Sequence, residues 1–502
     1  MLAIELGRRG VRCMLVERKS APQFLPKMER CNARTMEIFR RMGLAAKVRA
    51  AGLPAEVPMD VYIVRALDQP PLLHSPYPSV EEARRAIDAC NDGSMPLEPY
   101  QLISQYTLEP LLKSEAEKVS LVRYGCAFES FEQDATGVTT QTSAGPIRSK
   151  YLVGCDGGAS AVRHQLGIAL RGEADILRLR QALYRCDELF DRLPIKGGSG
   201  GAIGPGKGRH YHVADERSTF LIMQDSTRHW TLHAVVGEDR EMAVQFEKTV
   251  GVPVKYEMLY VGEWKQNLLL AERYGNGRVY LAGDAVHLMI PTGGLGMNSG
   301  VGDAIDLAWK LEGTLRGWGG PNLLASYEIE RRQVGERNVA ASRYASLGRR
   351  KWRSLWRNLD ELVAAAKVEQ PKSNEMIGAE LGYRYEGSPL IDDEPGGPEH
   401  PLRQYIPTTW PGARLPHVWL EGHTALQDRI GDGYTLLRLG GSTQSISSLG
   451  NAPFEVLDIR DAVARDLYGF DLILLRPDLH IAWRGNRLPA DIEKLAAKVT
   501  GH

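Results

Sequence analysis

Hydrophobic and polar residues change their spacing several times along the chain, and each change predicts a different element. Apolar residues at Leu2 and Leu6, with a glycine at position 10, predict a helix that ends at Gly10. Residues 11–16 are mostly apolar and lead to Glu17, as in a buried strand with an acidic tip. A helix that stops at glycine and leads into such a strand is typical of the second half of a βαβ nucleotide-binding unit.

The first strand of such a unit, with its GxGxxG turn, would precede Met1. The glycine runs at 197–201 and 204–208 do not replace it, because they lack the spacing and the strand–helix context. We expect an in-frame strand and glycine fingerprint to be encoded upstream of Met1. The alternative is a remnant that binds its nucleotide poorly.

Farther along, the pattern alternates between helices and strands. Helices are predicted for 33–50, 106–119 and most of 303–362. The segment 122–142 predicts a hairpin or meander, and apolar runs such as 219–223 and 230–236 predict an antiparallel sheet between about 174 and 264. A Gly/Pro-rich stretch at 392–398 predicts a linker, and 471–483 predicts a hairpin that turns at 476–478.

The most informative segment runs from 279 to 298. A buried strand, 279–282, ends in Gly283-Asp284, a turn with Pro291 and a glycine cluster follow, and a helix begins near Asn298. Glycines let the backbone approach a ligand closely, and a helix start carries partial positive charge. This pattern predicts a polar ligand held by a carboxylate and by backbone N–H groups.

Composition narrows the function classes. The 502 residues are enough for more than one domain, and 43% are hydrophobic and 25% charged, as in a globular protein. The net charge is zero, so we expect neither a nucleic-acid nor a membrane partner. All six cysteines precede residue 187 without metal-ligand spacing, so we expect no metal site and a reducing compartment. With no apolar span or signal sequence, a cytoplasmic location is expected.

Three further positions are candidates for ligand contacts. A second strand tip, Asp156, precedes Ser160 and Arg163, and the tips of parallel strands converge on one crevice. Arg30 offers planar recognition of a phosphate, and Gln105 offers an amide at a helix start. Taken singly, Asp156 is compatible with a plain strand–turn–helix connection, Gln105 with a surface amide, and Arg30 is more often a charge on a helix surface.

Five motifs in register resemble the single-component FAD-dependent aromatic hydroxylases, which include para-hydroxybenzoate hydroxylase, phenol hydroxylase and the polyketide hydroxylases. The motifs are Glu17-Arg18, Arg30 with 34–39, 103–110, 154–163 and 283–298. The likeness continues through 303–311 and 327–332. The last hundred residues resemble the thioredoxin-like domain of the phenol and polyketide hydroxylase branch. The resemblance therefore covers nearly the whole chain.

The resemblance implies an α/β fold with a Rossmann-like FAD-binding domain whose first strand is missing, an inserted antiparallel β-sheet substrate domain and a C-terminal thioredoxin-like domain. The implied FAD-binding domain comprises 1–58, 100–172 and 270–350, and the implied substrate domain comprises 59–99 and 173–269. A helical segment and linker, 351–398, precede the thioredoxin-like domain at 399–502. Because the last domain contains no cysteine, we expect structural support or a homodimer contact rather than redox chemistry.

The same resemblance implies a set of cofactor contacts. Glu17, with Arg18 beside it, would hold the FAD ribose, and Arg30 and Gln105 would lie along the adenosine and pyrophosphate. Asp156 lies in a motif associated with both FAD and NAD(P)H. Asp284 would bind ribityl or pyrophosphate oxygens. Backbone N–H groups would face the flavin pyrimidine ring from Gly293, Gly294, Leu295, Gly296, Met297 and Asn298.

The implied activity is a monooxygenation that uses NAD(P)H and O2 to hydroxylate a phenolic or polycyclic aromatic substrate through a flavin C4a-hydroperoxide. Pro291 would face the reacting flavin edge, and Tyr211 and His212 are the predicted catalytic side chains. Epoxidation, Baeyer–Villiger insertion and an FAD-binding-deficient remnant are the alternatives. Halogenation is disfavoured, because Trp352 and Trp356 do not match the Trp-x-Trp-x-Ile-Pro motif of flavin halogenases.

Overall fold

The computed structural model describes residues 1–25, 28–193 and 209–502, so both glycine runs at 197–208 lie outside the described residues. Parallel strands form two short pieces. β1 (Met14–Glu17) pairs with β6 (Leu121–Tyr124), and β10 (Leu152–Gly154) pairs with β17 (Val279–Leu281), which also pairs with β16 (Gly275–Asn276). No strand pairing within the described residues joins the two pieces. The Met1 amino group lies near residues of both, since Cys13 and Cys155 influence its pKa, which burial lowers.

Helices surround these strands. The predicted helix at the start is confirmed as α1 (Leu2–Arg8), and Gly10 follows it with φ +69°. The single helix predicted over 33–50 is wrong, because Gly43 takes φ +72° and separates α2 (Ala33–Arg41) from α3 (Ala45–Ala51). The other members of this layer are α5 (Gln105–Glu117), α6 (Ala161–Gln165) and α9 (Gly296–Arg316).

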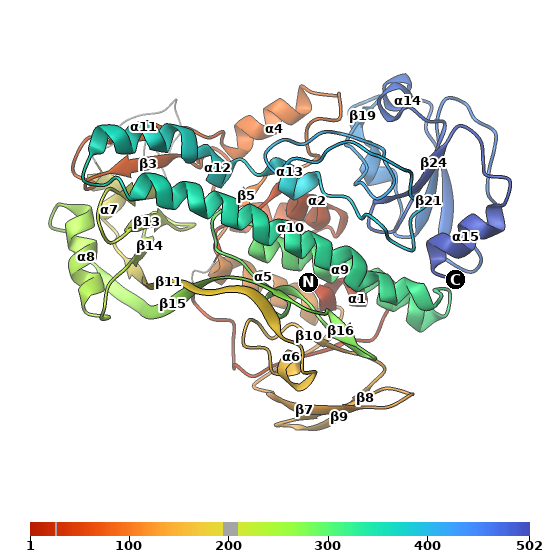
Figure 1. Cartoon of the computed structure of the whole chain (residues 1–502), viewed down its shortest axis with the longest axis horizontal. Coiled ribbons are helices and arrows are strands. Elements are labelled where there is room, and N and C mark those ends of the chain that lie inside the picture. Colours follow the sequence, from red (N-terminus) through yellow and green to blue (C-terminus); the bar gives the residue numbers. More distant parts are fainter. Residues whose placement is uncertain (26–27, 194–208) are drawn as a thin grey trace.

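An eight-stranded sheet occupies the left half of the molecule in Figure 1, in the order β18-β15-β11-β14-β13-β12-β3-β4. Its strands are β3 (Val61–Val64), β4 (Leu73–Ser75), β11 (Leu170–Arg185), β12 (His210–Val213), β13 (Phe220–Met223), β14 (His229–Ala234), β15 (Glu257–Ala271) and β18 (His287–Leu288). The predicted antiparallel pairing of 219–223 with 230–236 is confirmed. Within this sheet only β12 and β3 pair in parallel, and β3 comes from a part of the chain that lies far before β12.

One face of this sheet carries the largest apolar core. Tyr184, Tyr211 and Trp230 are fully buried there against α8 (Glu241–Val250), which adds Met242 and Phe246. Because side chains alternate along a strand, His210 and His212 project from the opposite face, towards α10. The sheet therefore has an apolar outer face and a polar inner face.

Several smaller elements complete the two large regions. They are β2 (Arg30–Cys31), β5 (Gln101–Leu102), α4 (Val80–Asp88), the meander β7 (Phe128–Gln133), β8 (Val138–Thr142) and β9 (Gly145–Ser149), α7 (Leu189–Arg192) and the 3-10 turn η1 (Gly283–Ala285). The meander confirms the prediction for 122–142.

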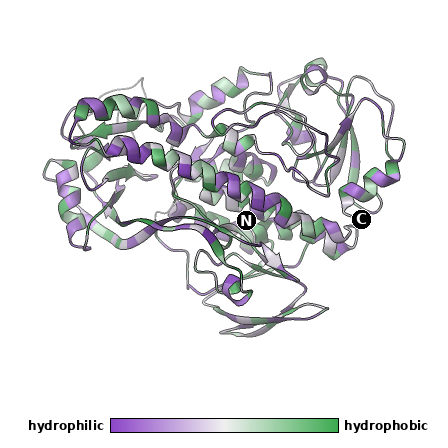
Figure 2. Ribbon diagram, in the orientation of Figure 1, coloured by the Kyte–Doolittle hydropathy of each residue, from purple (hydrophilic) through white to green (hydrophobic). Residues whose placement is uncertain are grey.

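A long helix, α10 (Pro321–Arg353), runs across the molecule and contacts α9, β15 and α11 (Leu359–Glu369). Figure 2 shows hydrophobic and hydrophilic bands alternating along it, as expected for a helix buried on one side. Short helices α12 (Pro371–Asn374) and α13 (Ile377–Leu381) follow α11. No helix in the described ranges is long and apolar enough to cross a membrane.

The C-terminal part has a four-stranded sheet in the order β22-β21-β23-β24. Its elements are β19 (Trp419–Leu420), β20 (Thr424–Ala425), η2 (Leu426–Arg429), β21 (Tyr434–Arg438), β22 (Phe454–Asp458), α14 (Ala462–Tyr468), β23 (Leu472–Leu475), β24 (Ile481–Gly485) and α15 (Ile492–Thr500). β21 and β22 are parallel and the other pairs are antiparallel, as in a thioredoxin-like core. The predicted 471–483 hairpin is confirmed.

Candidate active site

The glycine loop between β18 and α9, residues 291–295, is shaped by two left-handed glycines. Gly293 has φ +96° and Gly294 has φ +67°, and the Gly294 N–H donates to Pro291 O over 2.9 Å. Helix α9 then begins without a side-chain cap, and the N–H groups of Gly296, Met297 and Asn298 have no acceptor among the described residues. Such N–H groups can bind an anionic or carbonyl oxygen at the helix start. Pro291 itself is exposed.

The buried Asn298 side chain holds this loop against the N-terminal part of the chain. Its amide nitrogen donates to Gly294 O over 2.6 Å and to Arg30 O over 3.3 Å. Its carbonyl oxygen accepts from the Thr35 hydroxyl and from the Asn32 N–H. Asn298 therefore acts as a structural link, and only its backbone N–H is available to a ligand.

Arg30 reaches the same loop from β2. Its guanidinium donates to Gly293 O over 3.1 Å and pairs with Glu380 on α13 at 3.2 Å. Burial raises the pKa of Glu380, and Arg30 opposes that effect. The structure thus brings together Arg30, Gly293, Gly294 and Asn298, although they are up to 268 residues apart in the chain.

Behind the loop, Asp303 on α9 fixes the turn that carries Asp284. Its carboxylate accepts from the Gly283 N–H, from His287 Nε2 and from Arg331 Nε, over 3.0, 2.8 and 2.9 Å. Burial raises the pKa of Asp303, but His287 and Arg331 outweigh burial and lower the pKa to about 2. Asp284 is exposed and has no hydrogen bond with the described residues, so its carboxylate is available to a ligand.

The two predicted strand tips lie side by side, because β10 and β17 are adjacent parallel strands. Arg163 connects them by donating to Gly158 O and to Ala285 O. The Asp156 carboxylate accepts from the Val162 N–H over 3.1 Å in the first turn of α6, whose N-cap is Ser160. The strand, turn and helix expected around Asp156 are present, and its contact with a cofactor stays a prediction.

The remaining predicted cofactor residues lie in the N-terminal half. Glu17 ends β1 and accepts from the Lys19 N–H, Arg18 is exposed, and Gln105 begins α5 and donates to Glu109. None of the three contacts the glycine loop among the hydrogen bonds of the described residues. Their joint role with that loop therefore stays a prediction.

The structure does not bring Tyr211 and His212 together. Tyr211 stacks on Tyr62 in the outer core, and its hydroxyl has no hydrogen-bond partner among the described residues. His212 lies on the inner face, where its Nδ1 accepts from Arg353 over 2.6 Å. Adjacent residues of a strand face opposite sides, so the two side chains cannot line one pocket.

Arg209 and His210 belong to the same candidate segment of the sequence as Tyr211 and His212, but they were not selected as catalytic residues, and Glu29 was missed. His210 Nε2 lies 2.9 Å from the Glu29 carboxylate, and Arg209 Nη2 lies 3.7 Å from it. Burial raises the pKa of Glu29, but His210 and Arg209 lower it to about 2. Alternation along β12 would have placed His210 beside His212, but nothing in the sequence indicates that Glu29 meets them.

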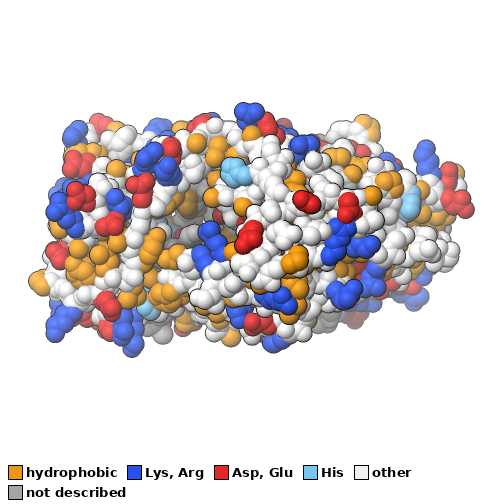
Figure 3. Space-filling view, turned by 90° about the horizontal axis from the view of Figure 1, so that it is seen from below, with side chains coloured by type: hydrophobic (Ala, Val, Ile, Leu, Met, Phe, Trp, Pro, Cys, Tyr) orange, Lys and Arg blue, Asp and Glu red, His pale blue; other side chains and the backbone are white. Residues whose placement is uncertain are grey.

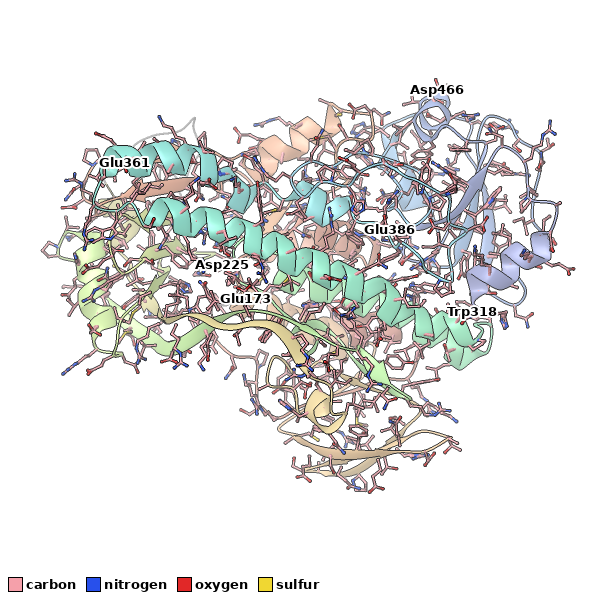
Figure 4. All side chains as sticks on the ribbon, viewed as in Figure 1. Glu173, Asp225, Trp318, Glu361, Glu386 and Asp466 are labelled. Carbon is pink, nitrogen blue, oxygen red and sulfur yellow. The ribbon has the colours of Figure 1, made fainter. Side chains whose placement is uncertain are left out.

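Asp225, which is labelled in Figure 4 and follows strand β13, connects the eight-stranded sheet to α5 through hydrogen bonds. It accepts from the Ser104 N–H and hydroxyl and from the Tyr106 hydroxyl at 2.8 Å. The inner face of the sheet is thereby held against the start of α5.

Comparison with known proteins decides the family. A model described as an FAD binding domain matches residues 1–342, and one described as the C-terminal part of aromatic-ring hydroxylases matches 408–502. The chain belongs to the FAD-dependent aromatic-ring hydroxylases. Like the rest of this family it is a monooxygenase with FAD as its cofactor, and NAD(P)H is the typical co-substrate.

Individual hydroxylases and monooxygenases match over nearly their full length. The chain is 30% identical to the FAD-dependent monooxygenase apdD of Emericella nidulans, over 99% of this chain and 88% of the relative. It is 30% identical to aklavinone 12-hydroxylase RdmE of Streptomyces purpurascens, over 97% and 94%. The flavin-dependent monooxygenase PieE, solved with FAD and substrate, superposes with a TM-score of 0.86 at 27% identity, covering 99% of this chain and 96% of that one.

Proposed function

We propose that this hydroxylase uses O2 and NAD(P)H to insert an oxygen atom into a phenolic or polycyclic aromatic compound. The observation that carries the proposal is the open helix start at 296–298, whose three unpaired N–H groups lie beside Arg30. The names of the relatives support the substrate class, because they include hydroxylases of aklavinone and a monooxygenase of 4-methyl-5-nitrocatechol.

The cofactor contacts are proposed residue by residue. Glu17, with Arg18 beside it, would accept the ribose hydroxyls, and Arg30, Gln105 and Asp284 would contact the phosphates or ribityl oxygens. The backbone N–H groups within 293–298 would contact the flavin pyrimidine ring, where a reduced flavin carries negative charge that oriented amides stabilise. Asp156 would contribute through the turn that precedes α6.

The FAD, once bound and reduced, supplies the chemistry that activates O2 for attack on an electron-rich ring. The chain's own task on the substrate side is to hold the phenolic proton. His210 can do so because its Nε2–H donates to Glu29, which leaves Nδ1 as a base. Nδ1 makes no hydrogen bond within the described residues, so it is available to a substrate hydroxyl. Pro291, exposed at the end of the loop, would face the reacting flavin edge.

The test is flavin-loaded enzyme with NADPH and a panel of phenols, naphthols and hydroxyanthraquinones. We expect phenol-stimulated NADPH oxidation and a product with one added hydroxyl group, labelled when 18O2 is supplied. An epoxide or lactone product would favour the alternative chemistries. Failure to retain FAD after reconstitution would favour the remnant. The variant His210→Asn should lower kcat more at pH 7.5 than at pH 9, where the phenol ionises without help.

Three coarser expectations belong to the same proposal. The proposed substrate domain, 59–99 with 173–269, is supported by the eight-stranded sheet, because β3 and β4 from its first part lie in one sheet with β11–β15. Limited proteolysis tests whether cleavage falls at the predicted domain boundaries. A cytoplasmic location agrees with six free cysteines. A homodimer would show twice the mass of the chain by light scattering.

A further inference from the structure

Two arginines on the last turns of α10 face the inner side of the eight-stranded sheet. Arg349 and Arg353 are one helical turn apart and project from the same side of α10. Both guanidiniums lie over the ring of Phe220, with centroid distances of 6.0 and 5.5 Å. Phe220 in turn stacks on His233 at 4.3 Å with the two rings almost parallel. The two positive charges therefore border an aromatic surface.

Neither arginine has a carboxylate partner within the described residues. No Asp or Glu there lies within 4.0 Å of either guanidinium, whereas the buried Arg331, Arg414 and Arg476 each pair with a carboxylate. Residues 26–27 and 194–208, outside the described part, contain no acidic residue at all. On the face shown in Figure 3, by contrast, basic side chains lie among acidic ones.

The neighbours of the pair do not neutralise it. Arg353 Nη2 donates to His212 Nδ1 over 2.6 Å and to Thr219 O over 3.3 Å. An imidazole that accepts from a guanidinium is neutral, and burial and Arg353 together hold the pKa of His212 well below its usual value. The Nε atoms of both arginines are buried and have no acceptor within the described residues.

Burial and the nearness of the two charges both disfavour the charged form of these arginines. Burial, with a smaller contribution from the charge of Arg349, lowers the pKa of Arg353 to about 9, and Asp215 opposes this effect. Burial likewise lowers the pKa of Arg349 to about 10, against a small opposing effect of Glu29. A buried charge that lacks its counterion is costly, so an anion that entered between the two guanidiniums would be strongly favoured.

The position of the pair relates it to the proposed flavin loop. Ser342, on the same helix, donates to Ile290 O immediately before Pro291. At 1.5 Å per residue, Arg349 lies about 10 Å and Arg353 about 16 Å along α10 from that contact. These are distances along the helix axis, and they place the two arginines well away from the loop, which favours a substrate longer than a single benzoate ring.

We propose that Arg349 and Arg353 bind a carboxylate of the aromatic substrate and select polycyclic compounds that carry this group at the end remote from the hydroxylated ring. The inference rests on the proposed function, whose substrate class it narrows. Arginine suits the task because its planar donors match a carboxylate in pairs.

The test uses two probes that differ only in charge, 6-hydroxy-2-naphthoate and its primary amide, 6-hydroxy-2-naphthamide. Their dissociation constants for the FAD-loaded enzyme are measured from probe fluorescence without NADPH, so that binding is separated from turnover. We expect the carboxylate to bind about 10- to 100-fold more tightly than the amide. Arg349→Gln and Arg353→Gln should each remove about 10-fold of this preference and leave the affinity for the amide within about 2-fold.

Arg350→Gln is the matched control, since Arg350 is the exposed neighbour of Arg349 on the same helix. It should leave the preference unchanged. Arg353→Lys, which keeps the charge without the planar fork, should retain part of it. Equal binding of acid and amide by the wild type would overturn the inference. So would an arginine variant that raises KM for NADPH while leaving the substrate preference intact, because the anion would then be a phosphate of the nucleotide.

The two proposals fail in different ways. If the carboxylate binds through the arginines but neither probe is hydroxylated or stimulates NADPH oxidation, the anion site stands and the activity is wrong for these compounds. If neutral phenols are hydroxylated and the carboxylate has no advantage, the activity stands and the anion site is refuted.

Discussion

Asp303→Asn removes the charge that holds the η1 turn, His287 and Arg331 together. The folded pKa of Asp303 is about 2 and the ordinary value is 3.8, which corresponds to about 2 kcal/mol of stability at neutral pH. The amide nitrogen of asparagine would also point an N–H donor towards the Gly283 N–H, His287 or Arg331, which are themselves donors to Asp303. Because Arg331 then stays buried without its counterion, the loss should reach about 3 kcal/mol or more.

The assay is thermal unfolding of the apoprotein, followed by circular dichroism. A loss of about 3 kcal/mol lowers Tm by about 6–12 °C in a unit of 150–250 residues. The lowered pKa means that the Asp303 contribution is present above about pH 4 and is lost as the pH falls towards 2. The variant should therefore be the less stable protein at both pH 7.5 and pH 5.

Asp284→Asn is the matched control, because Asp284 is exposed and unpartnered within the described residues. It should leave the Tm of the apoprotein unchanged and weaken FAD binding. A Tm for Asp303→Asn within about 2 °C of the wild type would refute the reasoning, since it would mean that the buried network carries no net stability.

Three further predictions concern other parts of the molecule. Asn298→Ala removes four side-chain hydrogen bonds and should lower the affinity for FAD at least about 10-fold in a fluorescence titration. An unchanged affinity would show that the glycine loop keeps its shape without these hydrogen bonds. Tyr211→Phe deletes a buried hydroxyl that has no hydrogen-bond partner among the described residues, so kcat should stay within about 2-fold of the wild-type value. A loss of kcat of about 10-fold or more would support the catalytic role predicted from the sequence. Arg414→Met removes the closer of the two arginines that pair with the buried Glu37 carboxylate and should destabilise the protein by about 3 kcal/mol in urea unfolding, with Arg414→Lys retaining part of the stability. Equal stability of all three proteins would contradict this.

Local sequence patterns predicted those elements whose structure depends on their own residues. The turn at Gly283, the left-handed Gly293 and Gly294 and the start of α9 follow from glycine placement and apolar spacing, and all are found where expected. The antiparallel pair β13–β14 and the hairpin β23–β24 also follow from alternation over a few residues. The break of the 33–50 helix at Gly43 was missed, because a glycine inside an apolar periodicity does not by itself end a helix.

Site residues that depend on distant contacts could not be predicted in the same way. Glu29 meets His210 across 181 residues, and Arg353 meets His212 across 141. Both contacts exist only because α10 and the segment before β2 pack on the inner face of the eight-stranded sheet. Alternation predicts that Tyr211 and His212 point to opposite faces, but it cannot say which face adjoins the flavin loop.

The sequence by itself predicted the loop that begins α9, because a nucleotide-binding turn is specified by glycines and acidic residues close together in the chain. Its motifs indicated the family and the FAD cofactor through their resemblance to the aromatic hydroxylases. The tertiary structure decided which side chains share the inner face: Glu29 with His210, and Arg349 and Arg353 with no carboxylate partner among the described residues. The physical reason is that burial and charge pairing are properties of the packed molecule. A guanidinium becomes an anion site only when folding removes it from water and provides no carboxylate beside it.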